Sequence, residues 1–314
     1  MEIHNQNKNI SLWQPRLGLM NMSKCIMLMT AIFVVSGVFT SKVFAYNVYQ
    51  TYDKVKFESS EVYKSQKVFL SANLSKPDGE GPFPTVVMMH GCGGWQPAVR
   101  TTLSSYRDFL VKNGFAVLNL DSFGPRRNSG GEVCASFKKL KDAREYRTVD
   151  ALDAFNYLKT KDFVDDDNIF LMGQSNGGSV AINVANSSRP GLGFRAVVAY
   201  YPWCGAFGSR KVDLSSPLLV LGGAKDDWVP PQSCNKVVSL GEELRVIIYP
   251  EAAHSFDVNM LPQRYLGKLV GYNKSAAENS RVTMLDFFND HLSSKAKQRT
   301  VQQKVVKLSE AGTQ

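Results

Sequence analysis

The sequence feature that most constrains the fold is a serine in a glycine-rich segment, GQSNG at 173–177. It matches the G-x-S-x-G pattern of a nucleophile elbow, a sharp strand-to-helix turn that presents a serine hydroxyl above the edge of a sheet. An apolar run at 169–172 precedes the segment, and a helical pattern over 179–185 follows it. The sequence therefore predicts strand, turn and helix here, with Ser175 as the candidate nucleophile. The alternative is an ordinary Gly/Ser turn between a buried strand and a packed helix.

Short apolar runs recur along the chain and alternate with helical patterns. The runs lie at 85–89, 115–120, 169–172, 196–200, 218–221 and 246–249. Because they are apolar throughout, they predict strands that are buried on both faces of a sheet. Apolar stripes at helical spacing predict helices near 102–112, 149–158 and 282–292. The alternation predicts an α/β fold with a mostly parallel central sheet and helices on both faces, to which 67–74 is expected to add an antiparallel edge strand.

The first 45 of the 314 residues differ from the rest. Arg16 and Lys24 precede an apolar run at 25–39, which is too short to cross a bilayer comfortably, and Ala45 ends a small-residue cleavage site. We expect a signal peptide over 1–45, an α/β domain over 46–293 and a basic extension over 294–314, with the domain exported to the periplasm or secreted. An uncleaved N-terminal anchor is the alternative, and translation that starts at Met20 or Met22 would shorten the segment.

Cysteine usage agrees with export. One of the five cysteines lies in the predicted signal peptide. The other four are an even number, which in an oxidising compartment predicts two disulfides. We expect Cys92 to pair with Cys134 and Cys204 with Cys234, because each pair would join loops on the same edge of the sheet. Free buried cysteines are the alternative. The sequence has no C-x-x-C pair or Cys/His cluster that would indicate a metal site.

The net charge of +9 is unevenly distributed along the chain. Most of it falls in the predicted signal peptide and the basic extension, so the domain between them is close to neutral. A near-neutral body with a basic tail is typical of a solvated terminus rather than of a nucleic-acid-binding face. We therefore expect no nucleic-acid partner, and membrane contact only through an uncleaved signal.

Polar or glycine-rich loops follow the predicted strands. They include HGCGG at 90–94, the elbow around Ser175, GGAKDD at 222–227 and PEAAHSF at 250–256. Because the carboxyl ends of parallel strands meet at one edge of a sheet, we expect the working residues to gather there. Their order along the chain, serine, then acid, then histidine, is the order of an α/β-hydrolase triad.

The two partners of Ser175 follow from position. His254 stands directly after a predicted strand, where its imidazole could accept the serine proton and later deliver it to the leaving group. The other histidines lie in the signal peptide, the glycine loop and the last helix. An acid is needed to orient the imidazole, and Asp226 and Asp227 are adjacent candidates. We favour Asp226, with Asp227 as a loop-capping residue.

An acyl-transfer site also needs donors for the oxyanion. The backbone N–H of Asn176, directly after the nucleophile, and that of Cys92 in the glycine loop are the candidates. Cys92 as nucleophile is an alternative, but it lacks an elbow. Arg126 could bind a substrate carboxylate and Trp203 could line the acyl or alcohol pocket; a solvated arginine and a merely buried aromatic are the alternatives.

From about Val68 to Leu292 the chain resembles a secreted member of the dienelactone hydrolase family of α/β-hydrolases. The motifs that carry the resemblance are HGCGG at 90–94, DSFGPR at 121–126, GQSNGG at 173–178, GAKDDWVP at 223–230 and YPEAAHSFD at 249–257. The resemblance implies an α/β-hydrolase fold and places the acid on Asp226, four residues before the proline of D-x-x-V-P. The chain departs from the namesake enzymes at the nucleophile, which is cysteine in them and Ser175 here.

The resemblance and the residues together predict a serine hydrolase that cleaves small-molecule carboxylic esters or lactones through an acyl-serine intermediate and requires no cofactor. A serine peptidase or acyltransferase of the same fold would use the same residues and differ only in pocket and leaving group. A noncatalytic exported binding protein is the alternative from another class. The sequence leaves the oligomeric state open.

Overall fold

The computed structural model describes residues 52–128, 130–186 and 193–299. The predicted signal peptide and residues 300–314 of the predicted basic extension lie outside this part of the chain. The strands are β1 (Asp53–Tyr63), β2 (Gln66–Ser75), β3 (Phe83–Met89), β4 (Ala116–Asp121), β5 (Val164–Gln174), β6 (Val197–Tyr200), β7 (Lys211–Val212), β8 (Leu218–Gly223), β9 (Val238–Ser239), β10 (Leu244–Tyr249), β11 (Gln263–Tyr265) and β12 (Lys268–Val270). The helices are α1 (Pro97–Lys112), α2 (Gly130–Cys134), α3 (Phe137–Leu158), α4 (Asn176–Ala185) and α5 (Lys274–Asp290), with 3-10 turns η1 (Gly124–Arg126), η2 (Cys204–Phe207) and η3 (Pro231–Lys236).

Within the described residues, the main sheet has eight strands in the order β1-β2-β4-β3-β5-β6-β8-β10. From β4 to β10 neighbouring strands are parallel, whereas β2 pairs antiparallel with both β1 and β4. The predicted mostly parallel central sheet is therefore confirmed. The prediction that 67–74 forms the edge strand was wrong, because β1 pairs outside it. The residues of β1 are largely polar and exposed, and its apolar alternation is short: Val55 and Phe57, which pack partly buried against the core, lie between charged residues.

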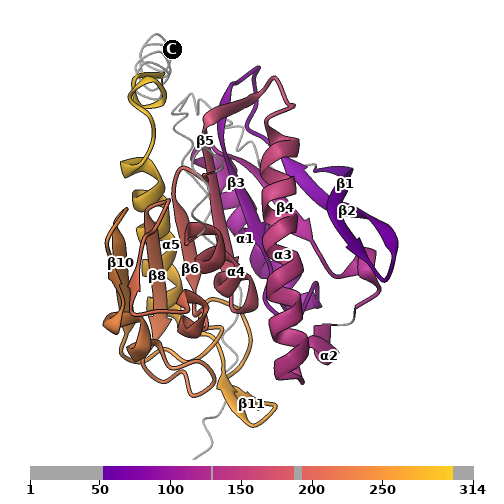
Figure 1. The fold of residues 1–314 in the computed structure, drawn as a ribbon. Helices are drawn as coiled ribbons and strands as arrows, with labels where there is room; N and C mark the ends of the chain where they lie inside the picture. Colours follow the sequence, from indigo (N-terminus) through magenta and orange to yellow (C-terminus); the bar gives the residue numbers. More distant parts are fainter. Residues whose placement is uncertain (1–51, 129, 187–192, 300–314) are drawn as a thin grey trace, which may run out of the picture. The chain divides into compact units, whose positions relative to one another are not determined.

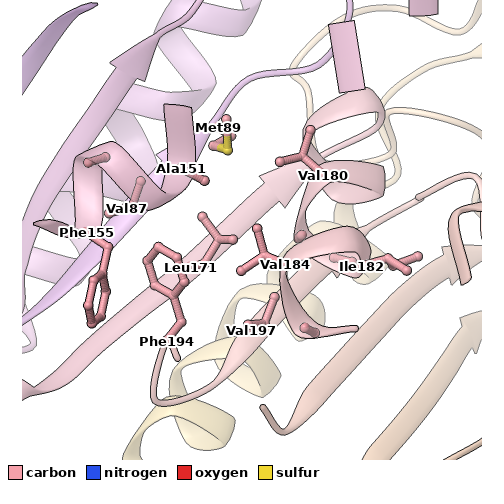
Figure 2. Close-up of a cluster of buried hydrophobic side chains, with 14 of the residues drawn as sticks. Val87, Met89, Ala151, Phe155, Leu171, Val180, Ile182, Val184, Phe194 and Val197 are labelled. Carbon is pink, nitrogen blue, oxygen red and sulfur yellow. The ribbon is translucent and has the colours of Figure 1, made fainter. Parts of the chain in front are cut away.

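Helices α3 and α4 cover one face of the sheet, and α1 and α5 cover the other (Figure 1). Successive side chains of a strand point to opposite faces, and β3 shows the consequence. Val87 and Met89 belong to the cluster under α3 and α4, whereas Val86 and Met88 belong to the cluster under α1 and α5. Figure 2 shows the first cluster, in which side chains from β3, α3, β5, α4 and β6 meet. Burial on both faces is why these strands are apolar throughout.

Both predicted disulfides are present. Cys92, in the loop after β3, is bonded to Cys134 at the end of α2, and Cys204 of η2 is bonded to Cys234 of η3. The first bond joins cysteines that are 42 residues apart in the sequence, and the second joins cysteines that are 30 residues apart. A disulfide that closes a loop of such length stabilises a fold by about 2–4 kcal/mol. The Cys92 bond also fixes the glycine loop that precedes α1.

Packing continues past the predicted end of the domain at residue 293. Ala296 is 3% exposed and belongs to the hydrophobic cluster that contains Phe288 of α5. Arg299 pairs with Asp165 of β5.

Within the part of the chain that the structure describes, none of the helices is both long enough and apolar enough to span a membrane.

Candidate active site

Ser175 lies in the turn between the end of β5 at Gln174 and the start of α4 at Asn176. Its φ of 52° and ψ of −113° are unfavourable for a residue with a side chain and cost about 1–3 kcal/mol. The turn is close enough that a Cβ atom on Gly173 would lie 2.1 Å from the carbonyl oxygen of Gly177, and one on Gly177 would lie 2.5 Å from that of Met89. Glycine at both positions therefore allows the chain to hold Ser175 in this conformation.

The structure brings Ser175, His254 and Asp226 together. Nε2 of His254 lies 2.9 Å from Oγ of Ser175, and Nδ1 of His254 lies 2.7 Å from Oδ2 of Asp226. His254 is 2% exposed and Asp226 3% exposed, so water is largely excluded from the contact between them, whereas Ser175 is half-buried and lines the cavities described below. In this arrangement Nδ1–H donates to the carboxylate, and Nε2 is left to accept the serine proton.

Asp226 is held by its own loop. Its Oδ1 accepts hydrogen bonds from the backbone N–H groups of Trp228 and Val229, both at 2.9 Å. With Oδ1 occupied in this way, Oδ2 is directed at His254. The carboxylate is thus oriented before any substrate binds, which is what a residue that fixes an imidazole requires.

Asp227 has a different role from the predicted one. It is exposed, its Oδ1 accepts a hydrogen bond of 2.7 Å from the backbone N–H of Leu269, and its Oδ2 accepts one of 3.1 Å from Arg264. The Leu269 N–H, followed by the Arg264 charge, lowers the pKa of Asp227. The prediction that Asp227 caps its own loop was wrong, because Asp226 makes the capping bonds and Asp227 fastens the β11–β12 hairpin.

The imidazole of His254 is enclosed by aromatic rings. The ring of Tyr201 meets it edge-on at a centroid distance of 4.8 Å, and the ring of Trp228 lies at 5.1 Å. The backbone of His254 pairs with Val270 of β12, and its carbonyl oxygen accepts a hydrogen bond of 3.2 Å from the N–H of Gly271. The hairpin that Asp227 fastens therefore also supports the histidine loop.

A buried carboxylate lies beneath the site. Asp257 is 2% exposed and accepts hydrogen bonds from Tyr106 at 2.9 Å, Tyr201 at 2.6 Å and Gln174 at 2.7 Å. Burial raises the pKa of Asp257 above its ordinary value. Gln174 directly precedes the nucleophile Ser175, and the Tyr201 ring contacts His254. By binding both Gln174 and Tyr201, Asp257 connects the residues that hold Ser175 and His254 in place. Sequence reasoning missed it, although it closes the motif YPEAAHSFD.

The two oxyanion candidates belong to backbone segments that are in close contact. Cys92 is 5% exposed and Asn176 is 6% exposed. A Cβ atom on Gly91 would lie 3.2 Å from Cβ of Ser175, so glycine lets the main chain of this loop approach the nucleophile. Asn176 is the first residue of α4, where backbone N–H groups are free of helical partners and the helix dipole favours negative charge.

Two cavities meet at Ser175. The first, of about 160 Å³, and the second, of about 290 Å³, share Cys92, Ser175, Trp228 and His254 as lining residues. The first is also lined by apolar side chains and two cations, among them Phe137, Leu140, Lys141, Arg144 and Trp203. The second is lined mainly by uncharged residues, among them Val99, Tyr201, Val258, Met260 and Tyr265. Trp203 lines the first cavity, and its contact with an acyl or alcohol group stays a prediction.

Arg126 does not lie in either cavity. Its side chain is fully buried and donates two hydrogen bonds to the carboxylate of Asp150, at 2.8 and 2.9 Å, and one of 3.0 Å to the carbonyl oxygen of Ser122. The prediction that Arg126 contacts substrate was therefore wrong. The chain segment that carries it turns inward after β4, toward α3.

Arg144 lies where Arg126 was expected. It lines the first cavity, and its guanidinium lies 4.9 Å from the centre of the Trp203 ring. Its Nε and Nη1 atoms are buried, and neither has a hydrogen-bond partner among the described residues. Sequence reasoning missed Arg144 because it is one of many charged residues in α3, and no local pattern separates it from its solvated neighbours.

Comparison with known proteins agrees with this architecture. The sequence profile of the dienelactone hydrolase family matches residues 70–292. Among curated proteins, no sequence matches the chain.

Among the described residues, no group of three or more His, Cys, Asp or Glu side chains is placed to hold a metal ion.

Several solved structures are similar to the chain. A dienelactone hydrolase-like promiscuous phosphotriesterase from metagenomic libraries is 18% identical with a TM-score of 0.57, and the match covers 77% of this chain and 100% of the other. Thermogutta terrifontis esterase 2 is 16% identical with a TM-score of 0.51, over 76% and 93% of the two chains. A 2,6-dihydroxy-pseudo-oxynicotine hydrolase is 16% identical with a TM-score of 0.51, over 77% and 69%. These likenesses show a shared α/β-hydrolase fold.

Proposed function

The chain belongs to the dienelactone hydrolase family of hydrolases, and on this basis we propose that it cleaves carboxylic esters or lactones through an acyl intermediate on Ser175. The observation that carries the proposal is the pair of contacts that links the three residues: Ser175 Oγ lies 2.9 Å from His254 Nε2, and His254 Nδ1 lies 2.7 Å from Asp226 Oδ2. A serine hydroxyl is a weak nucleophile alone and becomes effective next to a base that a third group orients.

The first half of the reaction forms the acyl-enzyme. Oγ of Ser175 attacks the carbonyl carbon of the substrate while its proton passes to Nε2 of His254. The N–H groups of Asn176 and Cys92 donate to the oxygen that becomes negatively charged. Asp226 stabilises the imidazolium without taking its proton. When the tetrahedral species collapses, His254 protonates the departing alkoxide oxygen, which remains tethered if the substrate is a lactone.

The second half repeats these steps with water. His254 takes a proton from a water molecule, whose oxygen attacks the acyl carbon, and then returns the proton to Oγ of Ser175. The same two N–H groups stabilise the second tetrahedral species. Each proton that leaves one atom is delivered to another within this cycle, so the chain's own residues suffice for the chemistry.

The cavities indicate the size and charge of the substrate. Their volumes of about 160 and 290 Å³ suit a small ester with one group in each. Arg144 and Lys141 line the first cavity, whose lining includes no acidic residue, although Lys141 also lies 4.0 Å from the carboxylate of Glu145 outside it. Two cations in a partly apolar cavity favour an anionic group, and a guanidinium binds a carboxylate through paired hydrogen bonds. We therefore expect esters or lactones that carry a carboxylate.

The compartment is part of the proposal. Two disulfides in one domain are typical of proteins that fold in an oxidising environment. Together with the features of residues 1–45, they support export of the domain after removal of a signal peptide.

A partitioning experiment tests the acyl-enzyme mechanism. Esters with one acyl group and different phenol leaving groups are hydrolysed in the presence of methanol, and the ratio of acid to methyl ester is measured. A shared acyl-enzyme predicts the same ratio for every leaving group, and Ser175→Ala should abolish both products. A ratio that changes with the leaving group, or a folded protein that turns over no ester or lactone in a broad panel, would contradict the proposal.

A further inference from the structure

Arg147 lies at the junction between the two backbone segments of the proposed oxyanion site. It comes from α3 and is 0% exposed. Its Nη1 donates a hydrogen bond of 2.8 Å to Oδ1 of Asn176, and its Nη2 donates one of 2.6 Å to the carbonyl oxygen of His90. One partner is thus the residue after the nucleophile, and the other begins the glycine loop that contains Cys92.

This cation is buried against uncharged oxygens. Asp150, on the same helix, already receives two hydrogen bonds from Arg126. The guanidinium of Arg147 instead lies 5.0 Å from the centre of the Phe123 ring. Burial lowers the pKa of Arg147 to about 10, so it still carries its charge near neutral pH. Burying a charge without a carboxylate partner costs stability, and a neutral side chain would avoid that cost.

The two hydrogen bonds fix the groups next to the oxyanion donors. A peptide unit is planar, so holding the His90 carbonyl oxygen also fixes the plane that leads into Gly91. The Asn176 side chain is held from its other end as well, because its Nδ2 donates a hydrogen bond of 2.9 Å to the carbonyl oxygen of Leu140. The segments are in close contact, since a Cβ atom on Gly177 would lie 2.7 Å from the carbonyl oxygen of His90.

We propose that Arg147 is a positioning residue that clamps the two oxyanion-hole segments together and places a fixed positive charge behind them. Donors that are oriented before the reaction stabilise a developing negative charge without reorganisation. Arg147 acts through Asn176 and His90 and does not touch the substrate. This inference rests on the proposed serine hydrolase function.

Substitutions of Arg147 test the clamp through the split between kcat and KM. Arg147→Met keeps an unbranched stem that matches the arginine side chain as far as Nε, but removes its charge and both hydrogen bonds. We expect kcat to fall about 10²- to 10³-fold, as on loss of an oxyanion donor, while KM stays within about threefold. Arg147→Lys keeps the charge but cannot reach both partners as a planar fork, so its kcat should lie between those of Arg147→Met and the wild type.

Leu158→Ala is the matched control for a purely structural effect. Leu158 is fully buried on the same helix, about 16 Å along its axis from Arg147. We expect this variant to lower the melting temperature and leave kcat unchanged. A second readout is the rate at which a fluorophosphonate labels the protein, which should fall in Arg147→Met and stay at the wild-type value in Leu158→Ala.

The outcomes separate this inference from the function on which it rests. A wild-type protein that is not labelled would count against the proposed function itself. A labelled wild type together with a folded Arg147→Met variant of unchanged kcat and labelling rate would overturn only the clamp. If Arg147→Met does not fold, Arg147→Lys and Asn176→Ala take its place, because each breaks part of the clamp. Wild-type kcat in both would overturn the proposal.

Discussion

Oγ of Ser175 lies 2.9 Å from Nε2 of His254, although 79 residues separate them in the sequence. Ser175 follows β5, and His254 follows β10, two strands that are separated by β6 and β8 in the sheet. The contact forms because both loops leave the carboxyl edge of the sheet and the His254 loop, which β12 supports, runs back along that edge.

Replacement of the nucleophile should remove activity without unfolding the protein. Ser175→Ala is expected to lower kcat by about 10⁴-fold or more, because the members of a triad act as a unit. Ester hydrolysis and circular dichroism measure the two properties. Ser233→Ala, at an exposed serine of η3, is the control and should keep wild-type activity. Appreciable turnover by Ser175→Ala would remove the serine from the mechanism.

The two adjacent aspartates should differ sharply. Asp226→Asn leaves an amide opposite Nδ1 of His254, which disfavours the productive tautomer, so kcat should fall by about 10⁴-fold. Asp227→Asn removes an exposed ion pair with Arg264, which is worth about 1 kcal/mol or less, and should change kcat little. Steady-state kinetics of both variants measure this difference in kcat. A larger loss of kcat in Asp227→Asn than in Asp226→Asn would assign the acid role to Asp227.

The two arginines near α3 should affect different properties. Arg126→Leu leaves the buried Asp150 unpaired and should lower the free energy of unfolding by about 3–5 kcal/mol, part of which Arg126→Leu with Asp150→Leu should recover. Arg144→Leu should instead raise KM about tenfold or more for an ester that carries a carboxylate, and not for its neutral counterpart. Urea denaturation and paired substrates measure these effects. An equal change in KM for both esters would rule out the carboxylate contact.

Stability should fall with acid partly because of His90. Burial, followed by the nearby charge of Arg147, lowers the pKa of His90 well below its ordinary value. Below about pH 6.5 the unfolded chain binds a proton here that the folded chain does not, so unfolding becomes easier as pH falls. When the pH falls from about 7.5 to 5, this group should lower the free energy of unfolding of the wild type by about 2 kcal/mol. His90→Asn lacks the group and should not show this loss. Parallel curves for the two proteins in urea would contradict this role.

Local patterns predicted the parts of the molecule that depend on neighbouring residues. The strand, turn and helix around Ser175 follow from glycines that relieve crowding within a few residues. Strands β3, β4, β5, β6, β8 and β10 follow from apolar runs. Strand β1 was missed because its apolar alternation is short, with Val55 and Phe57 among largely exposed polar residues.

Both disulfide pairs were predicted, but other long-range contacts have no local signal in the sequence. Whether Asp226 or Asp227 faces His254 depends on a turn in which Oδ1 of Asp226 accepts two backbone N–H groups. The inward position of Arg126 depends on Asp150, which arrives from another element. Arg144 and Arg147 lie in one charged helix, and only the packing of that helix against the Ser175 loop distinguishes their surroundings.

Labelling of the purified protein with a fluorophosphonate, followed by peptide mapping, tests the central claim most directly. The reagent requires an activated serine, so a single adduct on Ser175 is expected, with none in His254→Ala, which lacks the base. A folded wild-type protein that takes up no reagent, or takes it up on another residue, would contradict the assignment of Ser175 as the nucleophile.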